Sequence, residues 1–340
     1  MNYIWELKEI EKIEKNGLKV FTCFSCGGGS SMGYKLSGYE VLGNVEIDPK
    51  IMAVYKANHK PKYPFLMGVQ EFKKISNDKL PRELFELDIL DGSPPCSTFS
   101  IAGSREKAWD KNKKFREGQA EQVLSDLFFD FIDIADKLKP KVIIAENVKG
   151  LILGNAKGYV KAINDKLNAI GYDVQLFLLN SASMGVPQRR ERTFFVGRRK
   201  DLNLSKLELK FNEPSISYKD VEKTLKTKYG KKATEDKIPL WNITPVGKSF
   251  SYAHPNSSYF NSCKINPDAP ISTITASDGG GAYHYKEPYL LSDEALIKCG
   301  TFPIDYNFLN QKVKYLVGMS VPPLMMEKIS KQVYIQWFKR

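Results

Sequence analysis

Short apolar runs alternate with helix-like spacing of apolar residues through the first two hundred positions of the chain. Runs rich in β-forming residues fall at six places, namely 18–24, 40–47, 84–90, 142–145, 174–179 and 193–196. Apolar residues at intervals of three and four predict helices between them, around 30–36 and over 50–59, 119–137 and 159–170. Strands and helices that alternate in this way predict a doubly wound α/β sheet.

Both ends of this alternating region follow other patterns. Residues 4–15 have the spacing of a short amphipathic helix that stops at Asn16-Gly17. After residue 198 the alternation gives way to a Lys- and Asn-rich stretch with several prolines, and we assign a second, smaller domain to 199–285. Residues 314–336 again look like strand, turn and helix. We therefore expect the segment 286–340 to complete the large domain formed by 1–198.

The chain carries more basic than acidic residues. Its 340 residues include 51 lysines and arginines against 39 aspartates and glutamates, a formal charge of +12. A basic surface gains affinity by neutralising phosphates and releasing their counterions, so nucleic acid is a more fitting partner than a membrane. Five cysteines, an odd number, argue against a disulfide framework and favour a reduced, cytoplasmic setting. The charged first residues predict no signal peptide, and no stretch reaches the ~18 apolar residues of a membrane span.

A glycine-rich turn at 25–29 follows the first predicted strand. Glycines permit a tight turn and close approach of the backbone to a nucleotide-like cofactor. Glu46 and Asp48 follow the next strand, where a carboxylate can accept hydrogen bonds from ribose hydroxyls. On these features alone the acids could equally be structural, and the turn alone would also suit a nicotinamide-dependent oxidoreductase.

Several reactive residue types also fall directly after predicted strands. Pro94-Pro95 fixes the backbone before Cys96, which becomes a nucleophile only as an activated thiolate and is otherwise an inert buried cysteine. Glu146 follows an apolar strand, where poor hydration raises the pKa of a carboxyl and makes it a proton donor. In the run 188–192, Gln188, Arg190 and Arg192 alternate, so an extended chain would turn them to one face. A solvated basic strand would have the same pattern.

Taken in order, these segments resemble the motifs of cytosine-C5 DNA methyltransferases of the bacterial restriction-modification or phage type, which use S-adenosylmethionine. The resemblance spans nearly the whole chain and rests on the segments 24–29, 46–48, 92–100, 146–151, 188–192, 270–275 and 318–323. It implies a Rossmann-like methyltransferase domain over 1–198 and 286–340, with a target-recognition domain over 199–285. It also argues against the oxidoreductase.

The resemblance implies a covalent mechanism at cytosine. The thiolate of Cys96 would add to C6, so that C5 becomes nucleophilic enough to take a methyl group. Glu146 would hold or protonate N3 and the exocyclic amine, Arg190 would bind O2, and Arg192 would orient this group, which stabilises charge that grows on the ring. Because C6 is shielded in stacked DNA, the target nucleotide would be flipped into the pocket.

The resemblance further implies where the cofactor and the nucleic acid bind. S-adenosylmethionine would contact Phe24, Ser25, Gly27, Gly28, Gly29, Glu46, Ile47, Asp48, Val69, Pro94, Met319, Ser320 and Val321. Ser100 and Arg105 of the active-site loop, together with Gln188, would contact double-stranded DNA. Lysines of the recognition domain would meet phosphates without reading sequence; they are Lys223, Lys226, Lys228, Lys231 and Lys232.

Other partners follow less directly. We expect a monomer, possessing no metal site, because the pair Cys23 and Cys26 lacks a second pair of ligands nearby. A cognate restriction endonuclease would act separately. The target sequence cannot be read from these residues.

Several positions depart from the family pattern, and most of them fall in or near the cofactor pocket. Cys26 stands where the first glycine of the turn is usual, Val69 where an aspartate is common, Ser97 replaces a glutamine, and Met319 replaces an asparagine. These departures keep open an altered cofactor affinity or identity. They also keep open a catalytically weak nucleic-acid-binding homologue, while methylation of tRNA on the same fold is a further alternative.

Overall fold

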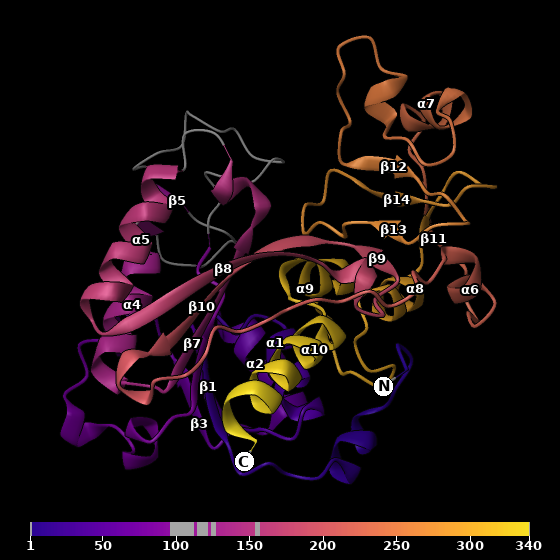
Figure 1. Cartoon of the computed structure of the whole chain (residues 1–340). Coiled ribbons are helices and arrows are strands. Elements are labelled where there is room, and N and C mark those ends of the chain that lie inside the picture. The colour runs from indigo at the N-terminus through magenta and orange to yellow at the C-terminus, as the bar shows by residue number, and fades with distance from the viewer. Residues whose placement is uncertain (1, 96–111, 114–121, 124–126, 154–156, 340) are drawn as a thin grey trace. The chain divides into compact units, whose positions relative to one another are not determined.

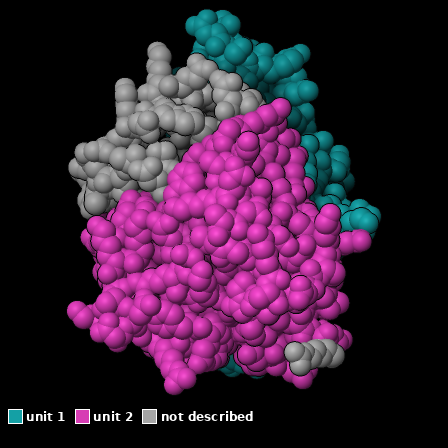
Figure 2. Space-filling model, turned by 60° about the vertical axis from the view of Figure 1, so that its left-hand side comes forward, with its two compact units in different colours: residues 1–12, 180–190, 210–326 teal, residues 13–179, 191–209, 327–340 magenta. Residues whose placement is uncertain are grey.

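The computed structural model describes residues 2–95, 112–113, 122–123, 127–153 and 157–339. The chain divides into two compact units, which Figure 2 shows in different colours. Unit 1 comprises 1–12, 180–190 and 210–326, and unit 2 comprises 13–179, 191–209 and 327–340. Residues 286–326 thus group with unit 1, although we expected them to complete the methyltransferase domain. That expectation concerns function rather than compactness and stays a prediction.

A seven-stranded sheet forms the centre of unit 2 (Figure 1). Its strands lie in the order β3 (Tyr63–Leu66), β2 (Glu40–Glu46), β1 (Lys19–Cys23), β4 (Ile89–Gly92), β7 (Val142–Val148), β10 (Glu191–Arg199) and β8 (Tyr172–Asn180). The first five are parallel to their neighbours, whereas β10 is antiparallel to β7. The doubly wound α/β sheet is confirmed.

Helices cover both faces of this sheet. They are α1 (Gly29–Leu36), α2 (Pro49–His59), α3 (Val69–Phe72), α4 (Leu127–Leu138), α5 (Lys157–Ala169) and α10 (Pro323–Val333). Successive side chains of a strand point to opposite faces of its sheet, so Asp91 and Gly92 of β4 show which helices lie on each face. The carboxyl of Asp91 reaches Tyr34 of α1, whereas a Cβ on Gly92 would lie 2.5 Å from the ring of Phe131 in α4. In Figure 1, α4 and α5 lie on one side, with α1 and α2 on the other.

The main core of unit 2 lies between the sheet and the α3, α4 and α5 layer. Burial of its aliphatic and aromatic side chains is the largest stabilising contribution that this geometry supplies. The helix predicted over 119–137 begins later, at Leu127, because Gln122–Val123 (β6) pairs with Asn112–Lys113 (β5) instead. The strand predicted to end before Glu146 continues to Val148, so Glu146 lies within β7.

Unit 1 contains a smaller sheet in the order β11 (Tyr229–Lys232), β15 (Tyr289–Leu291), β14 (Gly281–Tyr283) and β12 (Ser262–Lys264). Around it lie α6 (Tyr218–Glu222), α7 (Lys237–Ile243), α8 (Asp293–Cys299), α9 (Val313–Met319) and the pair β9 (Gln188–Arg189) and β13 (Ile271–Ser272). Its own core contains Ala233, Phe250 and Tyr283.

Two predictions in unit 1 were wrong. The expected strand near residue 314 is the helix α9, whose buried Leu316 and Val317 fill a short apolar run that fits either structure. The expected helix over 4–15 is a 3₁₀ helix at Leu7–Lys12 without buried residues. Trp5 instead anchors this segment, because its buried indole donates to the carbonyl of Thr301 at 2.9 Å.

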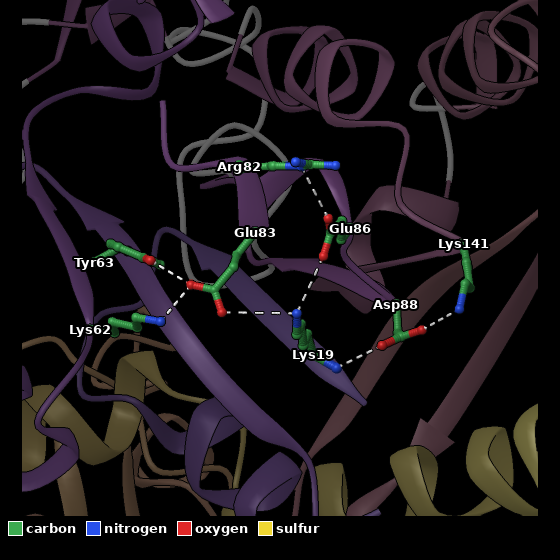
Figure 3. A network of polar contacts seen from close by, with 8 residues as sticks. All are labelled: Lys19, Lys62, Tyr63, Arg82, Glu83, Glu86, Asp88 and Lys141. Atoms are coloured by element: carbon green, nitrogen blue, oxygen red, sulfur yellow. Dashed lines mark hydrogen bonds and ion pairs between the residues drawn. The ribbon is translucent and has the colours of Figure 1, made fainter. Parts of the chain in front are cut away.

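Charged side chains gather at the amino ends of the strands in unit 2 (Figure 3). Asp88, directly before β4, accepts from the backbone N–H of Lys19 at 2.7 Å and from the ammonium of Lys141 at 2.7 Å. Glu83 accepts from Lys62 and Tyr63. These pairs lie partly in solvent and link the starts of β1, β3, β4 and β7.

Among the helices that the structure describes, none combines the length and apolar character needed to cross a bilayer.

Candidate functional site

The glycine-rich turn between β1 and α1 has an unusual backbone. Phe24, Cys26 and Gly28 have φ values of 56°, 44° and 70°, all in the left-handed region that L side chains rarely adopt. At Gly28 a Cβ would lie 2.1 Å from Nε2 of His59, so only glycine fits. Glycine, which the family resemblance leads us to expect at position 26, would adopt this φ without strain, whereas Cys26 is held in a strained conformation.

Side chains from β2 and its end hold this turn in place. One carboxyl oxygen of Glu46 accepts the backbone N–H of Cys26 at 3.0 Å, and the other accepts that of Asp48 at 3.0 Å. The amide of Asn44 donates to the hydroxyl of Ser25 at 2.8 Å. Burial raises the pKa of Glu46, while the backbone donors oppose that rise. A strained turn persists when its surroundings fix it from several sides, as they do here.

Asp48 has a second role besides its place in the predicted acidic pair. Its carboxyl caps α2 by accepting the N–H groups of Lys50 at 2.8 Å and Ile51 at 3.3 Å. Both predicted acids therefore have backbone partners. A carboxylate offers about four acceptor positions, so each retains capacity for a ligand hydroxyl.

The rings of Tyr55 and His59 support the turn from α2. They stack with centroids 4.1 Å apart, and the hydroxyl of Tyr55 lies 2.7 Å from that of Ser31 in α1. The pKa of His59 is lowered well below its usual range because the ring is buried, with Lys35 adding a smaller effect. His59 is therefore neutral near pH 7 and acts here as a packing ring.

A buried polar cluster lies beside the turn, on the α1 face of the sheet. Asp91 of β4 is 2% exposed and accepts hydrogen bonds from the hydroxyl of Thr22 at 2.9 Å and that of Tyr34 at 3.1 Å. Sequence reasoning missed Asp91. The signal that could have found it is a single acid inside an apolar strand, directly before Gly92.

Glu146 and Arg192 form a buried ion pair at the carboxyl end of β7. Nε of Arg192 lies 2.8 Å from a carboxyl oxygen of Glu146. The antiparallel register places Phe194 opposite Glu146 and Arg192 opposite Val148, so both charged side chains project from the same face. The neighbouring Asn147 donates its side-chain amide to the carbonyl of Pro94 at 3.1 Å. This hydrogen bond joins β7, the strand that carries Glu146, to the backbone at Pro94.

The other two residues of the predicted alternating set are buried in unit 1. The guanidinium of Arg190 donates to the carbonyls of Ile274 at 3.2 Å and Gly318 at 3.0 Å. Gln188 accepts the N–H of Ile274 and donates to the carbonyl of Cys299. Burial alternates along these residues as predicted, since Gln188 and Arg190 are buried and Arg189 is exposed. The DNA contact predicted for Gln188 and the base contact predicted for Arg190 stay predictions, and both side chains have backbone partners within unit 1.

The remaining predicted site residues are distributed as follows. Val69 packs in the core of unit 2, and the side chain of Ile47 lies close to Gly68. Met319, Ser320 and Val321 belong to unit 1, where the hydroxyl of Ser320 donates to the carbonyl of Leu316. Cys96, Ser100 and Arg105 lie outside the described residues. The five lysines of the predicted recognition domain are exposed.

Within the described part of the chain, no group of three or more His, Cys, Asp or Glu side chains is arranged to hold a metal ion.

A sheet of five parallel strands joined by the antiparallel strand β10, with a glycine turn after β1, is typical of the Rossmann-like methyltransferase class. Solved structures agree in fold. A prophage-encoded E. coli protein described as a DNA modification methyltransferase matches with a TM-score of 0.70 at 19% identity, covering 95% of this chain and 100% of that one. A mutant of Spodoptera frugiperda DNMT2 matches with a TM-score of 0.64 at 19% identity, covering 94% and 100%.

The chain belongs to the C-5 cytosine-specific DNA methylase family, whose model matches residues 18–334. The Type II methyltransferase M.NgoPII of Neisseria gonorrhoeae is 36% identical over 202 residues, which cover 59% of this chain and 52% of that protein. M1.HphI of Haemophilus parahaemolyticus is 29% identical over 335 residues, covering 91% and 85%. The chain thus spans about half the length of M.NgoPII, and nearly all of M1.HphI. The predicted family is confirmed.

Proposed function

We propose that this protein transfers a methyl group from S-adenosylmethionine to C5 of cytosine within a specific double-stranded DNA sequence. The observation that carries the proposal is the buried ion pair between Glu146 and Arg192 at the carboxyl end of β7. A carboxyl and a guanidinium fixed side by side can together recognise N3, the exocyclic amine and O2 of a flipped cytosine. Family membership and the Type II methyltransferase relatives support DNA as the substrate.

The chemistry assigns a role to each side chain. The thiolate of Cys96 adds to C6, Glu146 holds or protonates N3, and Arg192 stabilises the negative charge that grows toward O2. After methyl transfer a base removes the C5 proton, and the thiolate leaves. We assign the O2 contact to Arg192 rather than to Arg190, because Arg190 donates to two backbone carbonyls inside unit 1. Arg190 instead positions the segments around Ile274 and Gly318.

The residues at the turn fit S-adenosylmethionine, which supplies the methyl group when bound. Glu46 and Asp48 would accept hydrogen bonds from its ribose, and the turn of residues 24–29 would approach it through backbone groups. Three buried carboxyls at this edge, those of Glu46, Asp48 and Asp91, suit a cofactor that carries cationic sulfonium and ammonium groups. Val69, Met319, Ser320 and Val321 stay proposed cofactor contacts from the resemblance.

We assign target recognition to residues 199–285 and the methyltransferase function to 1–198 with 286–340. The exposed lysines of the recognition segment would neutralise phosphates and give affinity without sequence reading. Ser100 and Arg105 would contact the DNA around the flipped base. We further propose that the protein acts as a monomer in the cytoplasm, and that a cognate restriction endonuclease acts separately.

Bisulfite sequencing tests this function. Genomic DNA and tRNA would be sequenced from a methylation-free bacterial host that expresses the wild type, Cys96→Ala or Cys263→Ala. Cys263→Ala is the matched control, because Cys263 is a half-buried cysteine to which the proposed mechanism gives no role. We expect protected cytosines in one recurring DNA context with the wild type and Cys263→Ala, and none with Cys96→Ala. Protection in tRNA alone would establish the RNA alternative, and protection in neither, with soluble protein, would favour the non-catalytic homologue.

A further inference from the structure

Asp91 is a buried acid that the proposed mechanism does not use. It is the third residue of β4, paired in register with Thr22 of β1 and with Ile144 of β7. Its carboxyl is 2% exposed, and hydroxyls from β1 and α1 donate to both of its oxygens. One of the donors, Tyr34, belongs to the helix that begins directly after the glycine turn. Asp91 therefore lies immediately behind the proposed cofactor site.

The surroundings of Asp91 consist of hydroxyls and a second acid. The neighbouring groups that shift its pKa are Thr22 on β1, Ser30 and Tyr34 on α1, and Glu146 on β7. Burial raises the pKa of Asp91 to about 7, the hydroxyls oppose the rise, and the charge of Glu146 adds to it. Burial raises the pKa values of the neighbouring Cys23 and Tyr55, and the charge of Asp91 adds to the rise, so both groups stay protonated near neutrality.

We propose that Asp91 releases a proton to solvent when the cationic cofactor binds at the glycine turn, and that its carboxylate then stabilises the bound cation from behind the turn. This inference rests on the proposed cofactor. A unit positive charge held within about 8 Å favours ionisation of a buried carboxyl by roughly tenfold to a hundredfold at an effective dielectric constant of about 20. The proton on Asp91 is therefore lost on binding near pH 6 to 7, and cofactor affinity rises with pH.

Isothermal titration of the full chain with S-adenosylmethionine tests this coupling. Binding is measured at pH 6.5 in two buffers of different ionisation enthalpy, which gives the number of protons released, and affinity is measured from pH 6 to pH 8. For the wild type we expect roughly half a proton or more beyond that released by Asp91→Asn. Its affinity should rise about five- to tenfold over this range, relative to the variant. The amine of the cofactor itself titrates equally in both proteins and cancels.

Two further variants separate proton coupling from a structural role. Asp88→Asn changes a buried carboxyl at the amino ends of the strands and should leave proton release at the wild-type value. Tyr34→Phe removes a hydroxyl that donates to the carboxylate, so the affinity rise should move to higher pH by about half a unit or more. A merely structural role would not move this midpoint.

The outcomes are distinct. Equal proton release by the wild type and a folded Asp91→Asn variant overturns the inference, as does an unshifted midpoint in Tyr34→Phe. If the wild type does not bind S-adenosylmethionine at any pH, the proposed cofactor itself is wrong, and the inference falls with it.

Discussion

Carboxyl groups at the two ends of the strands in unit 2 show opposite pKa shifts. At the amino ends, Glu83 is partly exposed and accepts from Lys62 and Tyr63, and these donors lower its pKa (Figure 3). At the carboxyl ends, Glu46 and Asp91 are buried, and burial raises the pKa of each. The same side-chain chemistry gives a network of lysine-paired acids at one end, in which Asp88 is buried and Glu83 is not, and poorly hydrated acids with hydroxyl or backbone donors at the other.

This difference shows why the carboxyl ends can carry chemistry. Partly exposed ion pairs contribute only about 0–1 kcal/mol each and change little when a ligand approaches. Buried acids with hydroxyl or backbone N–H partners can hold or release a proton near neutral pH. The Glu146 and Arg192 pair also lies toward the carboxyl ends, where the two side chains are only 9% and 14% exposed.

The largest expected effect is that of Glu146→Gln. Glutamine keeps the shape of the side chain but removes both the charge that pairs with Arg192 and the acid proposed to act at N3 of cytosine. We expect methyl transfer into DNA to fall by about 10²- to 10⁴-fold, measured with labelled S-adenosylmethionine. Glu83→Gln, the matched change at the amino ends, should leave the rate within about twofold. Similar rates for both variants would contradict the contrast between the two ends.

Gly28→Ala should rank second. The new methyl group would overlap the ring of His59 while the φ of 70° stays unfavourable, so the turn must shift. We expect a loss of about 1–3 kcal/mol in the free energy of unfolding and at least tenfold weaker cofactor binding by titration. Gly17→Ala is the control, because Gly17 has a φ of 77° and no atom within 4 Å of the added carbon. A similar loss in both variants would mean that backbone strain, and not His59, sets the effect.

The pH dependence of stability should separate Asp91 from Asp88. The fold holds the proton of Asp91 up to about pH 7, whereas an unfolded aspartate loses it near its usual pKa of 3.8. At this residue the unfolded chain thus binds fewer protons in this window, so the contribution of Asp91 to stability falls as pH rises from about 4 to 7. Asp91→Asn lacks this loss, and its stability relative to wild type should rise over the window by up to about 4 kcal/mol.

Urea unfolding at pH 5, 6, 7 and 8 measures that difference. Asp88→Asn removes an acid that is paired with Lys141 and should show no such relative gain. A flat difference between wild type and Asp91→Asn would show that Asp91 is ionised throughout.

The smallest expected effect is that of Cys26→Gly. Glycine adopts the φ of 44° without strain and keeps the N–H that Glu46 accepts. Relief of strain exceeds the added entropy of the unfolded chain by a small margin, so the free energy of unfolding should rise by about 0.5–1 kcal/mol. Chemical denaturation of both proteins checks this. A decrease in the free energy of unfolding would show that the thiol of Cys26 stabilises the fold by more than the strained backbone destabilises it.

Much of the molecule could be predicted from its sequence. Strand-helix alternation located β1, β2, β7, β8 and β10 and indicated the doubly wound sheet, because each element carries its own hydrophobic period. The run predicted over 84–90 overlaps only the start of β4, because Arg82–Phe85 forms a 3₁₀ helix. The ordered motifs identified the family. Local patterns could not distinguish a helix from a strand in a short apolar run that fits both. The run around Val317 is such a case, because it forms a helix and not the expected strand.

The sequence by itself determined the residue types available for chemistry and their order along the chain. It could not determine which side chains share a face or who their partners are, because those depend on register and packing between distant segments. The alternating pattern predicts the same environment for Arg190 and Arg192. In the structure, pairing of β10 with β7 brings Arg192 into an ion pair with Glu146. Arg190 instead packs in unit 1 and donates to two backbone carbonyls. Asp91 became a candidate only in the tertiary structure, where β1 and α1 enclose its carboxyl and remove it from water.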